Sequence, residues 1–347
     1  MNKKTRERHA YYKSVFCSIN SVHTLARLLN IDIRRLRLLV DKPSYKTFRV
    51  PKKGGGERII EAPGHELKQV LGRLNRYLQS VYYFEKSAAA YGFILGVRND
   101  DDRRNVLTNA RKHLNKSYLL NVDLKDFFHA VTREQVLEIF LGKPFSFKRE
   151  IPDLLADLCT YDGRLPMGTP TSPVLSNFAC QKLDEELVGY SKDLLWVYTR
   201  YADDMSFSSN RYINEEQQVT LINLIKGFGF KVNQRKLKLY GPDEPKVVTG
   251  LLVTDKVSLA EDYIPTLKQD IEQLNQTMRI QNEHGQLSTK WVEQHKKQIL
   301  GRLNFAGFVL KRNHPDYLDL KQAFYSAIHP PEEEFSAMSW RGFPYNF

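Results

Sequence analysis

The sequence predicts an α+β protein in which short apolar strands end at acidic residues and amphipathic helices lie between and after them. Residues 196–209 are rich in aromatic and β-branched side chains on both sides of an adjacent acidic pair, a composition typical of two strands joined by a turn. Residues 117–123 form a second apolar segment that ends in an aspartate, and residues 66–83 and 291–309 carry apolar side chains at helical spacing. Both kinds of element therefore contribute to the predicted core.

The acidic strand ends predict a metal site. Asp203 and Asp204 are adjacent, so their charges repel unless a cation lies beside them, and a hard divalent cation prefers carboxylate oxygens. Asp123 lies 80 positions before Asp203 (203 minus 123), which suits neighbouring strands of one sheet. Such strand ends can hold two ions about 3.5–4 Å apart. We therefore predict that these three acids bind two Mg²⁺ ions, or Mn²⁺ in their place, for nucleotidyl transfer. The alternative is an ordinary turn that uses aspartate as a turn former.

Charge and composition narrow the partners. The 347 residues carry a formal net charge of +12 at pH 7, which favours a polyanion and does not by itself distinguish nucleic acid from an anionic membrane surface. No apolar run approaches the roughly 18–20 residues of a membrane-spanning helix, and no signal-peptide core follows residues 1–8. We expect a cytoplasmic protein with no membrane partner. Cys17, Cys159 and Cys180 lack zinc or disulfide spacing and are predicted to be buried apolar side chains.

Four segments, taken in order, resemble the motifs of a reverse transcriptase palm. They are residues 121–128 (NVDLKDFF), 165–173 (LPMGTPTSP), 201–204 (YADD) and 229–236 (GFKVNQRK). Two more, residues 109–113 (NARKH) and 248–250 (VTG), resemble signature segments of bacterial retron reverse transcriptases. The resemblance implies an RNA-directed DNA polymerase with a right-hand fold, made of fingers, an RNA-recognition-like palm sheet and a helical thumb.

The resemblance also implies a division of the chain. Residues 1–45 are predicted to be an N-terminal helical extension, whose arginines form either a solvated face or part of an RNA-binding surface. The remaining segments follow in order: fingers 46–118 and 140–164, palm 119–139 and 165–259, helical thumb 260–325, and C-terminal tail 326–347.

The resemblance assigns a nucleotide-binding role to four positions. Residues 45–61 read as a hairpin around the glycines at 54–56, and the resemblance implies that Arg58 and Lys53 grip the triphosphate, with Lys52 as the alternative to Lys53. It places Phe128 beneath the sugar, where its ring would exclude a 2′-hydroxyl, and a core phenylalanine is the other interpretation. Gly168 permits close approach of a base pair or nucleotide. It lies in a turn over residues 165–173 that is predicted to lead into one helix over residues 174–187.

Two further positions of the motifs bear on chemistry. The family usually has glutamine where this chain has Met167, a departure that affects nucleotide positioning and removes no metal ligand. Lys236 corresponds to a lysine near the leaving pyrophosphate and is predicted to act as a catalytic general acid. A simple phosphate-binding role within a basic stripe is the alternative.

The retron-like segments imply RNA contacts at Asn109, His113, Val248, Thr249 and Gly250. His113 has a second interpretation, support of the palm. The triad Asp100 to Asp102 precedes two arginines and is predicted to form a solvated turn or helix start rather than a metal site.

The implied reaction uses dNTPs and a cognate structured noncoding RNA that serves as template and primer. By resemblance, synthesis begins at a 2′-hydroxyl of an internal guanosine and yields a branched RNA–DNA (msDNA), and an effector or toxin protein is the partner in phage defence. Two alternatives remain open at this point. One is another bacterial reverse transcriptase that extends a different primer, and the other is a noncatalytic RNA-binding scaffold, against which the presence of all three acids argues.

Overall fold

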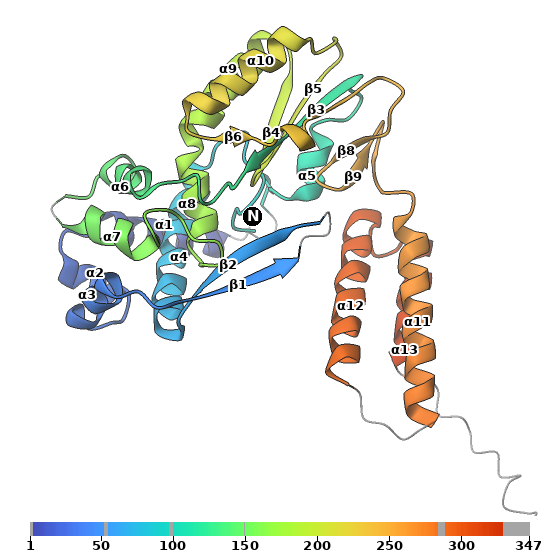
Figure 1. The fold of residues 1–347 in the computed structure, drawn as a ribbon, viewed down its shortest axis with the longest axis horizontal. Coiled ribbons are helices and arrows are strands. Elements are labelled where there is room, and N and C mark those ends of the chain that lie inside the picture. The colour runs from blue at the N-terminus through green and yellow to red at the C-terminus, as the bar shows by residue number, and fades with distance from the viewer. Residues whose placement is uncertain (1–2, 52–54, 97–99, 149, 284–288, 329–347) are drawn as a thin grey trace, which may run out of the picture. The chain divides into compact units, whose positions relative to one another are not determined.

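The computed structural model describes residues 3–51, 55–96, 100–148, 150–283 and 289–328 (Figure 1). The chain forms two compact units, one made of Met1–Thr249 with Val253–Asp255 and the other of Gly250–Leu252 with Lys256–Phe347. Strands and helices both build the first unit, so the α+β prediction is confirmed.

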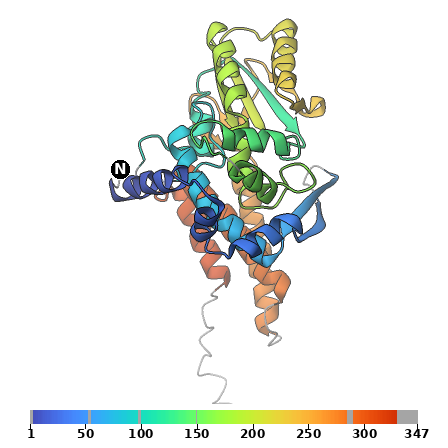
Figure 2. The same ribbon diagram turned by 90° about the vertical axis from the view of Figure 1, so that its left-hand side faces the viewer.

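Three helices open the first unit: α1 (Lys3–Cys17), α2 (Val22–Leu28) and α3 (Ile33–Asp41). Ser21 and Asp32 begin α2 and α3 because their side chains accept hydrogen bonds from backbone N–H groups of the first turn. Helix α1 packs against the long helix α4 (His65–Glu85), and the two lie side by side in dark and lighter blue in Figure 2.

The predicted hairpin is present as β1 (Tyr45–Pro51) and β2 (Glu57–Pro63), an antiparallel pair with Val50 opposite Arg58. Successive side chains of a strand point to opposite faces, so Arg58 and Ile60 share one face of β2. Lys53, predicted to contact the triphosphate, and the neighbouring Lys52 lie outside the described residues.

The central sheet carries the acidic strand ends. Its order is β4-β5-β3-β6, and β7 also pairs with β3. All the pairings of β3 are antiparallel, and Leu119, Leu120 and Val122 bury its apolar side chains in the core. The strand bounds are β3 (Tyr118–Lys125), β4 (Val197–Tyr201), β5 (Asp204–Ser209), β6 (Lys231–Val232) and β7 (Lys238–Tyr240).

Helices pack around this sheet, with α9 against β4 and α10 against β6. The sequence predicts one helix over 174–187, but the structure has α8 and α9 separated at Cys180, so that prediction is wrong at this point. The helices are α5 (Val106–Arg111), α6 (Arg133–Leu141), α7 (Ile151–Cys159), α8 (Ser172–Ala179), α9 (Gln181–Asp193) and α10 (Glu215–Gly227). Cys159 and Cys180 are fully buried, as predicted, whereas Cys17 is partly exposed.

Three short strands, β8 (Lys246–Val248), β9 (Leu251–Val253) and β10 (Val257–Leu259), form a sheet of order β10-β9-β8. The second unit continues as three helices, α11 (Tyr263–Glu283), α12 (Lys290–Leu310) and α13 (Pro315–Ile328), which contact one another. At Gly307 the helices α12 and α13 come so close that a Cβ atom would lie 2.5 Å from the Tyr317 ring. None of the helices in the described residues is long and apolar enough to cross a membrane.

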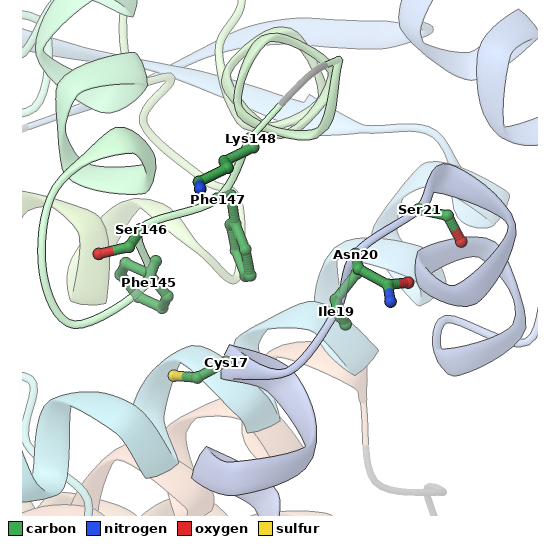
Figure 3. A pocket seen from close by; sticks show the side chains of 8 residues that line it. All are labelled: Cys17, Ile19, Asn20, Ser21, Phe145, Ser146, Phe147 and Lys148. Carbon is green, nitrogen blue, oxygen red and sulfur yellow. The ribbon is translucent and has the colours of Figure 1, made fainter.

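A surface pocket lies between the end of α1 and the segment that joins α6 to α7 (Figure 3). Phe145 and Phe147 line one side of it, and Cys17 and Asn20 line the other. None of the predicted site residues lines this pocket.

Candidate active site

The register of the central sheet brings the predicted acids together. Asp123, near the end of β3, lies opposite Asp204, the first residue of β5. Asp203 occupies the turn between β4 and β5, and its carbonyl oxygen accepts a hydrogen bond from the backbone N–H of Leu124 at 3.0 Å. Asp123 and Asp204 therefore stand on two adjacent strands in fixed register, and Asp203 lies in the turn beside them.

A gap in the other edge of β3 brings two polar residues to Asp123. Strands β6 and β7 both pair with β3, but the five residues between them, 233–237, leave the ladder. The Asn233 side chain donates to Asp123 Oδ2 at 3.0 Å, and Lys236 Nζ donates to Asp123 Oδ1 at 2.6 Å. Lys236 lies in the single 3₁₀ turn of this segment (Gln234–Lys236). The structure thus places the predicted general acid directly on a predicted metal ligand.

The electrostatics of the acids follow from burial and from one another. Burial, followed by repulsion from Asp203 and Asp123, raises the pKa of Asp204 to about 6. The pKa of Asp203 is also raised, mainly by burial and further by Asp123, while Lys236 and Arg58 act in the opposite direction. The hydrogen bond to Asp123 raises the pKa of Lys236, so the lysine stays charged. The negative charge of the three acids therefore exceeds the positive charge of Lys236 and Arg58 beside them.

This donor set suits a divalent cation. Carboxylate oxygens are the preferred ligands of hard cations, and a cation would relieve the mutual repulsion that raises the pKa of Asp203 and Asp204. Within the described part of the chain, no three His, Cys, Asp or Glu side chains already form a set of metal ligands. Asp123 is paired with Lys236, so a cation would compete with that lysine for the carboxylate.

Arg58 and Phe128, both predicted to bind nucleotide, lie near this cluster. The positive charge of Arg58 acts on Asp203, and Arg58 shares a face of β2 with Ile60, whose Cγ2 lies beside Gly168. Phe128 is half-buried with its ring centroid 5.9 Å from that of Phe93. Its neighbour Phe127 is a core residue.

Gly168 is constrained by the hairpin. Its φ of 132° lies in a region that residues with a Cβ rarely adopt, and a Cβ would lie 3.0 Å from the carbonyl oxygen of Glu61. The close neighbour in this structure is therefore the backbone of β2, which the sequence did not indicate. A nucleotide contact at Gly168 stays a prediction.

Glu61 is a site residue that the sequence analysis missed. Its side chain, only 5% exposed, accepts hydrogen bonds from the Arg164 guanidinium at 3.0 and 3.1 Å and pairs with His129 Nε2 at 3.0 Å. The backbone N–H of Met167 also donates to it, at 3.2 Å. Glu61 therefore joins the hairpin to the segments that carry Phe128 and Gly168. A glutamate in an exposed-looking hairpin gave no sequence signal for this.

Three residues predicted to contact RNA are buried in this structure. The side chains of Asn109, His113 and Val248 are at most 1% exposed, and RNA contacts at these positions stay predictions. His113 lies between Ser208 Oγ and Thr199 Oγ1, each at 2.7 Å, and therefore connects β5 and β4. This geometry favours its second interpretation, support of the sheet.

The two remaining RNA-binding predictions fall on a turn. Thr249 and Gly250 form the two-residue loop between β8 and β9 and have φ of 48° and 81°, as a type I′ turn requires. Gly250 is exposed, so this turn is accessible to a partner. The predicted turn at Asp100 to Asp102 is also present, and Asp102 pairs with Lys86 and Arg104.

Comparison with known proteins places the chain among polymerases. Residues 50–301 match the family described as reverse transcriptase (RNA-dependent DNA polymerase). The retron Ec86 reverse transcriptase of Escherichia coli is 30% identical over 278 residues, which cover 78% of this chain and 83% of that protein. The retron Mx65 reverse transcriptase of Myxococcus xanthus is 31% identical over 248 residues, which cover 66% of this chain and 56% of that protein.

A solved structure of apo telomerase from Candida tropicalis aligns with a TM-score of 0.48 and 12% identity, covering 82% of this chain and 58% of that chain. That similarity is too low to carry an argument. The family match by itself confirms the predicted right-hand polymerase class.

Proposed function

The chain belongs to the reverse transcriptase family, among the retron reverse transcriptases, and from this premise we propose that it copies a cognate structured noncoding RNA into a branched RNA–DNA product, msDNA. Its activity is that of an RNA-directed DNA polymerase. The observation that carries the proposal is the pairing of Asp123 with Asp204, with Asp203 in the adjoining turn and Lys236 on Asp123. The finer parts, which are the branched product, its RNA and its use, rest on the retron relatives.

The metal centre of the proposed reaction consists of Asp123, Asp203 and Asp204. These carboxylates would hold two Mg²⁺ ions, with Mn²⁺ as a substitute, since carboxylate oxygens suit both. When bound, the ions would lower the pKa of the attacking primer hydroxyl and offset the charge of the leaving pyrophosphate. Asn233 would keep the Asp123 carboxylate oriented through its 3.0 Å hydrogen bond.

Lys236 would act on the leaving group. It is charged, its side chain is 63% exposed, and it sits in a short turn outside the sheet ladder. Once a cation takes its place at Asp123, its ammonium group would be able to donate a proton to the departing pyrophosphate. A purely electrostatic contact to the phosphates is the alternative, and a lysine-to-arginine change separates the two because arginine keeps the charge and does not give up its proton.

Further residues would bind the nucleotide and the RNA. Arg58, and Lys53 from outside the described residues, would contact the triphosphate, Phe128 would exclude a ribose 2′-hydroxyl, and Gly168 would lie against the nucleotide. The exposed turn of Thr249 and Gly250 would contact the RNA. The positive charge of the chain supports a nucleic-acid partner.

The retron relatives extend the proposal to biology. The RNA would be encoded beside the gene and would supply both the template and the priming 2′-hydroxyl of an internal guanosine. An effector or toxin protein would be the partner, and the assembly would act in defence against phage. The similarity to named retron enzymes supports this extension.

The test is to purify the protein from cells that carry its native flanking DNA and to sequence the bound nucleic acid with and without debranching enzyme. We expect a branched RNA–DNA from the wild type, RNA alone from Asp203→Ala, and the branched product again from Asp193→Ala, which alters an exposed acid at the end of α9. Linear DNA from the wild type would favour a reverse transcriptase with a different primer. RNA alone from both the wild type and Asp203→Ala would favour a noncatalytic scaffold.

A further inference from the structure

The turn between β4 and β5, which carries Asp203 and is called the catalytic turn below, has a backbone conformation that neighbouring parts of the structure must stabilise. Ala202, immediately before Asp203, has a φ of 59°, a left-handed conformation that costs a residue with a Cβ roughly 1–2 kcal/mol. Such a conformation persists only where the surrounding structure determines it. Whatever holds Ala202 therefore also sets where the Asp203 carboxylate points.

A buried arginine holds the carbonyl of Ala202. Arg200 is fully buried, and its guanidinium donates to the Ala202 carbonyl oxygen at 3.2 Å. The same guanidinium forms a two-point ion pair with Asp184, which is also fully buried, with N–O distances of 2.8 and 2.7 Å. It donates as well to the side-chain oxygen of Asn177 at 3.0 Å. These partners leave the guanidinium little freedom to turn away from Ala202.

A second segment presses on the turn from the backbone side. The carbonyl oxygen of Ala89 accepts from the N–H of Arg200, and the N–H of Tyr91 donates to the carbonyl oxygen of Arg200, each at 2.7 Å. Residues 89–91 thus extend the central sheet beyond β4. The next residue, Gly92, is fixed by a hydrogen bond of 2.9 Å from the Asn177 side chain to its carbonyl oxygen.

Gly92 touches the turn so closely that no side chain fits. A Cβ on Gly92 would lie 2.7 Å from the backbone nitrogen of Ala202 and 3.2 Å from the carbonyl carbon of Tyr201. Both neighbours are backbone atoms, which cannot rotate away as the end of a flexible side chain could. Any side chain at Gly92 must therefore displace the turn.

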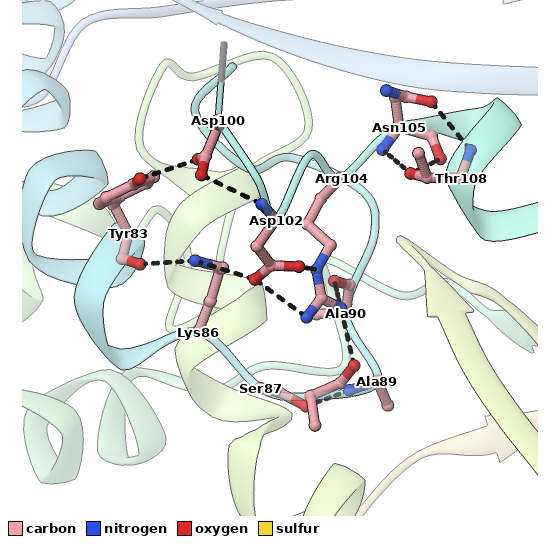
Figure 4. A network of polar contacts seen from close by, with 11 residues as sticks. Tyr83, Lys86, Ser87, Ala89, Ala90, Asp100, Asp102, Arg104, Asn105 and Thr108 are labelled. Carbon is pink, nitrogen blue, oxygen red and sulfur yellow. Dashed lines mark hydrogen bonds and ion pairs between the residues drawn. The ribbon is translucent and has the colours of Figure 1, made fainter. Parts of the chain in front are cut away.

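The segment is itself braced from the outside by Arg104 (Figure 4). The Arg104 guanidinium donates to the carbonyl oxygens of Ala88 and Ala90, at 2.7 and 3.3 Å, and lies over the Tyr91 ring at 4.5 Å from its centroid. Asp102 binds the other side of the guanidinium. A solvent-facing loop is in this way connected to the acidic turn through residues 88–92.

We propose that residues 89–92 support the backbone of the catalytic turn, and that Gly92, Arg200 and Arg104 are positioning residues that hold Asp203 for binding of a divalent cation. The proposal rests on the proposed function in that it takes Asp203 as a metal ligand. It adds residues that are not themselves proposed to contact substrate or metal. It also assigns residues 90–92 (AYG) a role in the reaction.

The test compares Gly92→Ala with the wild type in two measurements. Mn²⁺ binding to the protein without nucleotide is followed by the loss of the free-ion EPR signal, and primer extension is measured against Mg²⁺ concentration. Because residues that orient metal ligands typically change metal affinity about 10–100-fold, we expect at least a tenfold weaker Mn²⁺ affinity. The Mg²⁺ requirement should rise in parallel, kcat should fall, and the KM for template–primer should stay within about twofold.

Two glycines serve as matched controls. Gly307→Ala places a Cβ 2.5 Å from the Tyr317 ring in the second unit, and Gly189→Ala places one in open space. We expect the first to lower the melting temperature and the second to change little, and both to leave Mn²⁺ affinity unchanged. Wild-type affinity in Gly92→Ala, or an equal loss in Gly307→Ala, would overturn the proposal.

A milder variant covers the case in which Gly92→Ala does not fold. Arg104→Gln removes the outer brace and leaves the turn itself intact, and it should weaken Mn²⁺ binding in the same direction by a smaller factor. Unchanged Mn²⁺ affinity in a folded Arg104→Gln would then refute the proposed support of the turn by residues 89–92. Failure of the proposed function is separate, because a wild type that binds Mn²⁺ and makes only linear DNA does not contradict that support. A wild type that binds no Mn²⁺ overturns both.

Discussion

Glu61→Gln should weaken the contacts that hold the β1–β2 hairpin to the segments that carry Phe128 and Gly168. The change keeps the shape of the side chain and removes its charge. It also replaces a carboxylate oxygen with an NH₂ group, where the neighbours Arg164, His129 and the Met167 N–H are donors. At least one of them then faces another donor.

The structure bounds the cost of this change. A hydrogen bond to a charged group contributes about 1.5–3 kcal/mol, and breaking a fully buried ion pair costs about 3–5 kcal/mol. The Glu61 side chain is 5% exposed, but those of Arg164 and His129 are 27% and 23% exposed and can regain water. We therefore expect a loss near the lower figure, about 2–3 kcal/mol. For a unit of this size that corresponds to a melting temperature lower by roughly 5–10 °C.

The pH dependence gives the prediction a sign. Although burial acts to raise the pKa of Glu61, the hydrogen bonds from Arg164, Met167 and His129 outweigh it and lower that pKa. A carboxylate with a lowered pKa in the folded state stabilises the protein above its unfolded pKa of about 4.3, and this contribution disappears as the pH falls through the folded value. The part of the difference in melting temperature that depends on the Glu61 charge should be present above about pH 5.5 and shrink below about pH 4.

The assay combines thermal unfolding with primer extension. Because Glu61 contacts the segments that carry Phe128 and Gly168, we expect the KM for dNTP to rise about tenfold, equivalent to about 1.4 kcal/mol. Glu57→Gln, on the same strand but in a surface pair with Arg49, should change stability by less than about 1 kcal/mol. Equal stability and an unchanged KM in Glu61→Gln, or the same losses in Glu57→Gln, would refute the reasoning.

Three further outcomes are expected. Burial lowers the pKa of His113 to about 3, so its ring resonances in NMR should not titrate between pH 5 and pH 8. Its contribution to stability should be complete above about pH 6.5 and decline toward pH 3. Titration near pH 6.5 would contradict the buried position. A thiol reagent at pH 8 should modify Cys17 in the folded protein and reach Cys159 and Cys180 only after unfolding, because burial raises the pKa of both buried thiols to about 12; modification of all three at one rate would contradict this. Since Asp204 has a pKa of about 6 without metal, apparent Mn²⁺ affinity should rise between pH 5 and pH 7, and a flat profile would show that no proton is displaced.

The sequence indicates the acidic centre because its signals are local. Apolar, aromatic and β-branched residues predict the strands that carry Asp123 and Asp204, and the adjacent aspartates mark the turn between two of them. A hairpin over residues 45–61 is likewise predicted by a glycine cluster between two alternating segments. Each of these features needs only neighbours in the chain to be recognised.

The missed parts depend on partners far away in the chain. Arg164 lies 103 positions from Glu61, and the burial of Arg200 depends on Asp184 of a helix that precedes its strand. No local pattern states that a charged residue is buried, because burial is decided by what packs on it. The burial of His113 is hidden from the sequence for the same reason, because its two hydroxyl partners come from β4 and β5.

The break between α8 and α9 is missed for a different reason. Cys180 joins the two helices with nearly helical dihedral angles, a φ of −84° and a ψ of −3°, and neither glycine nor proline marks the position. The apolar spacing runs through the break because both helices bury one face in the same core. Helix propensity alone does not reveal such a change of direction.

The gap between β6 and β7 has a mechanical consequence. Asp123 and Asp204 belong to strands paired in one ladder, whereas the cations near them stand outside that ladder: Lys236 on one 3₁₀ turn and Arg58 on the β1–β2 hairpin, which Glu61 joins to the segments of Phe128 and Gly168. Negative charge thus stands on the central sheet, and the positive charge beside it comes from separate elements. We expect an arriving anionic substrate to attract Lys236 and Arg58 while the ladder keeps Asp123 and Asp204 in register.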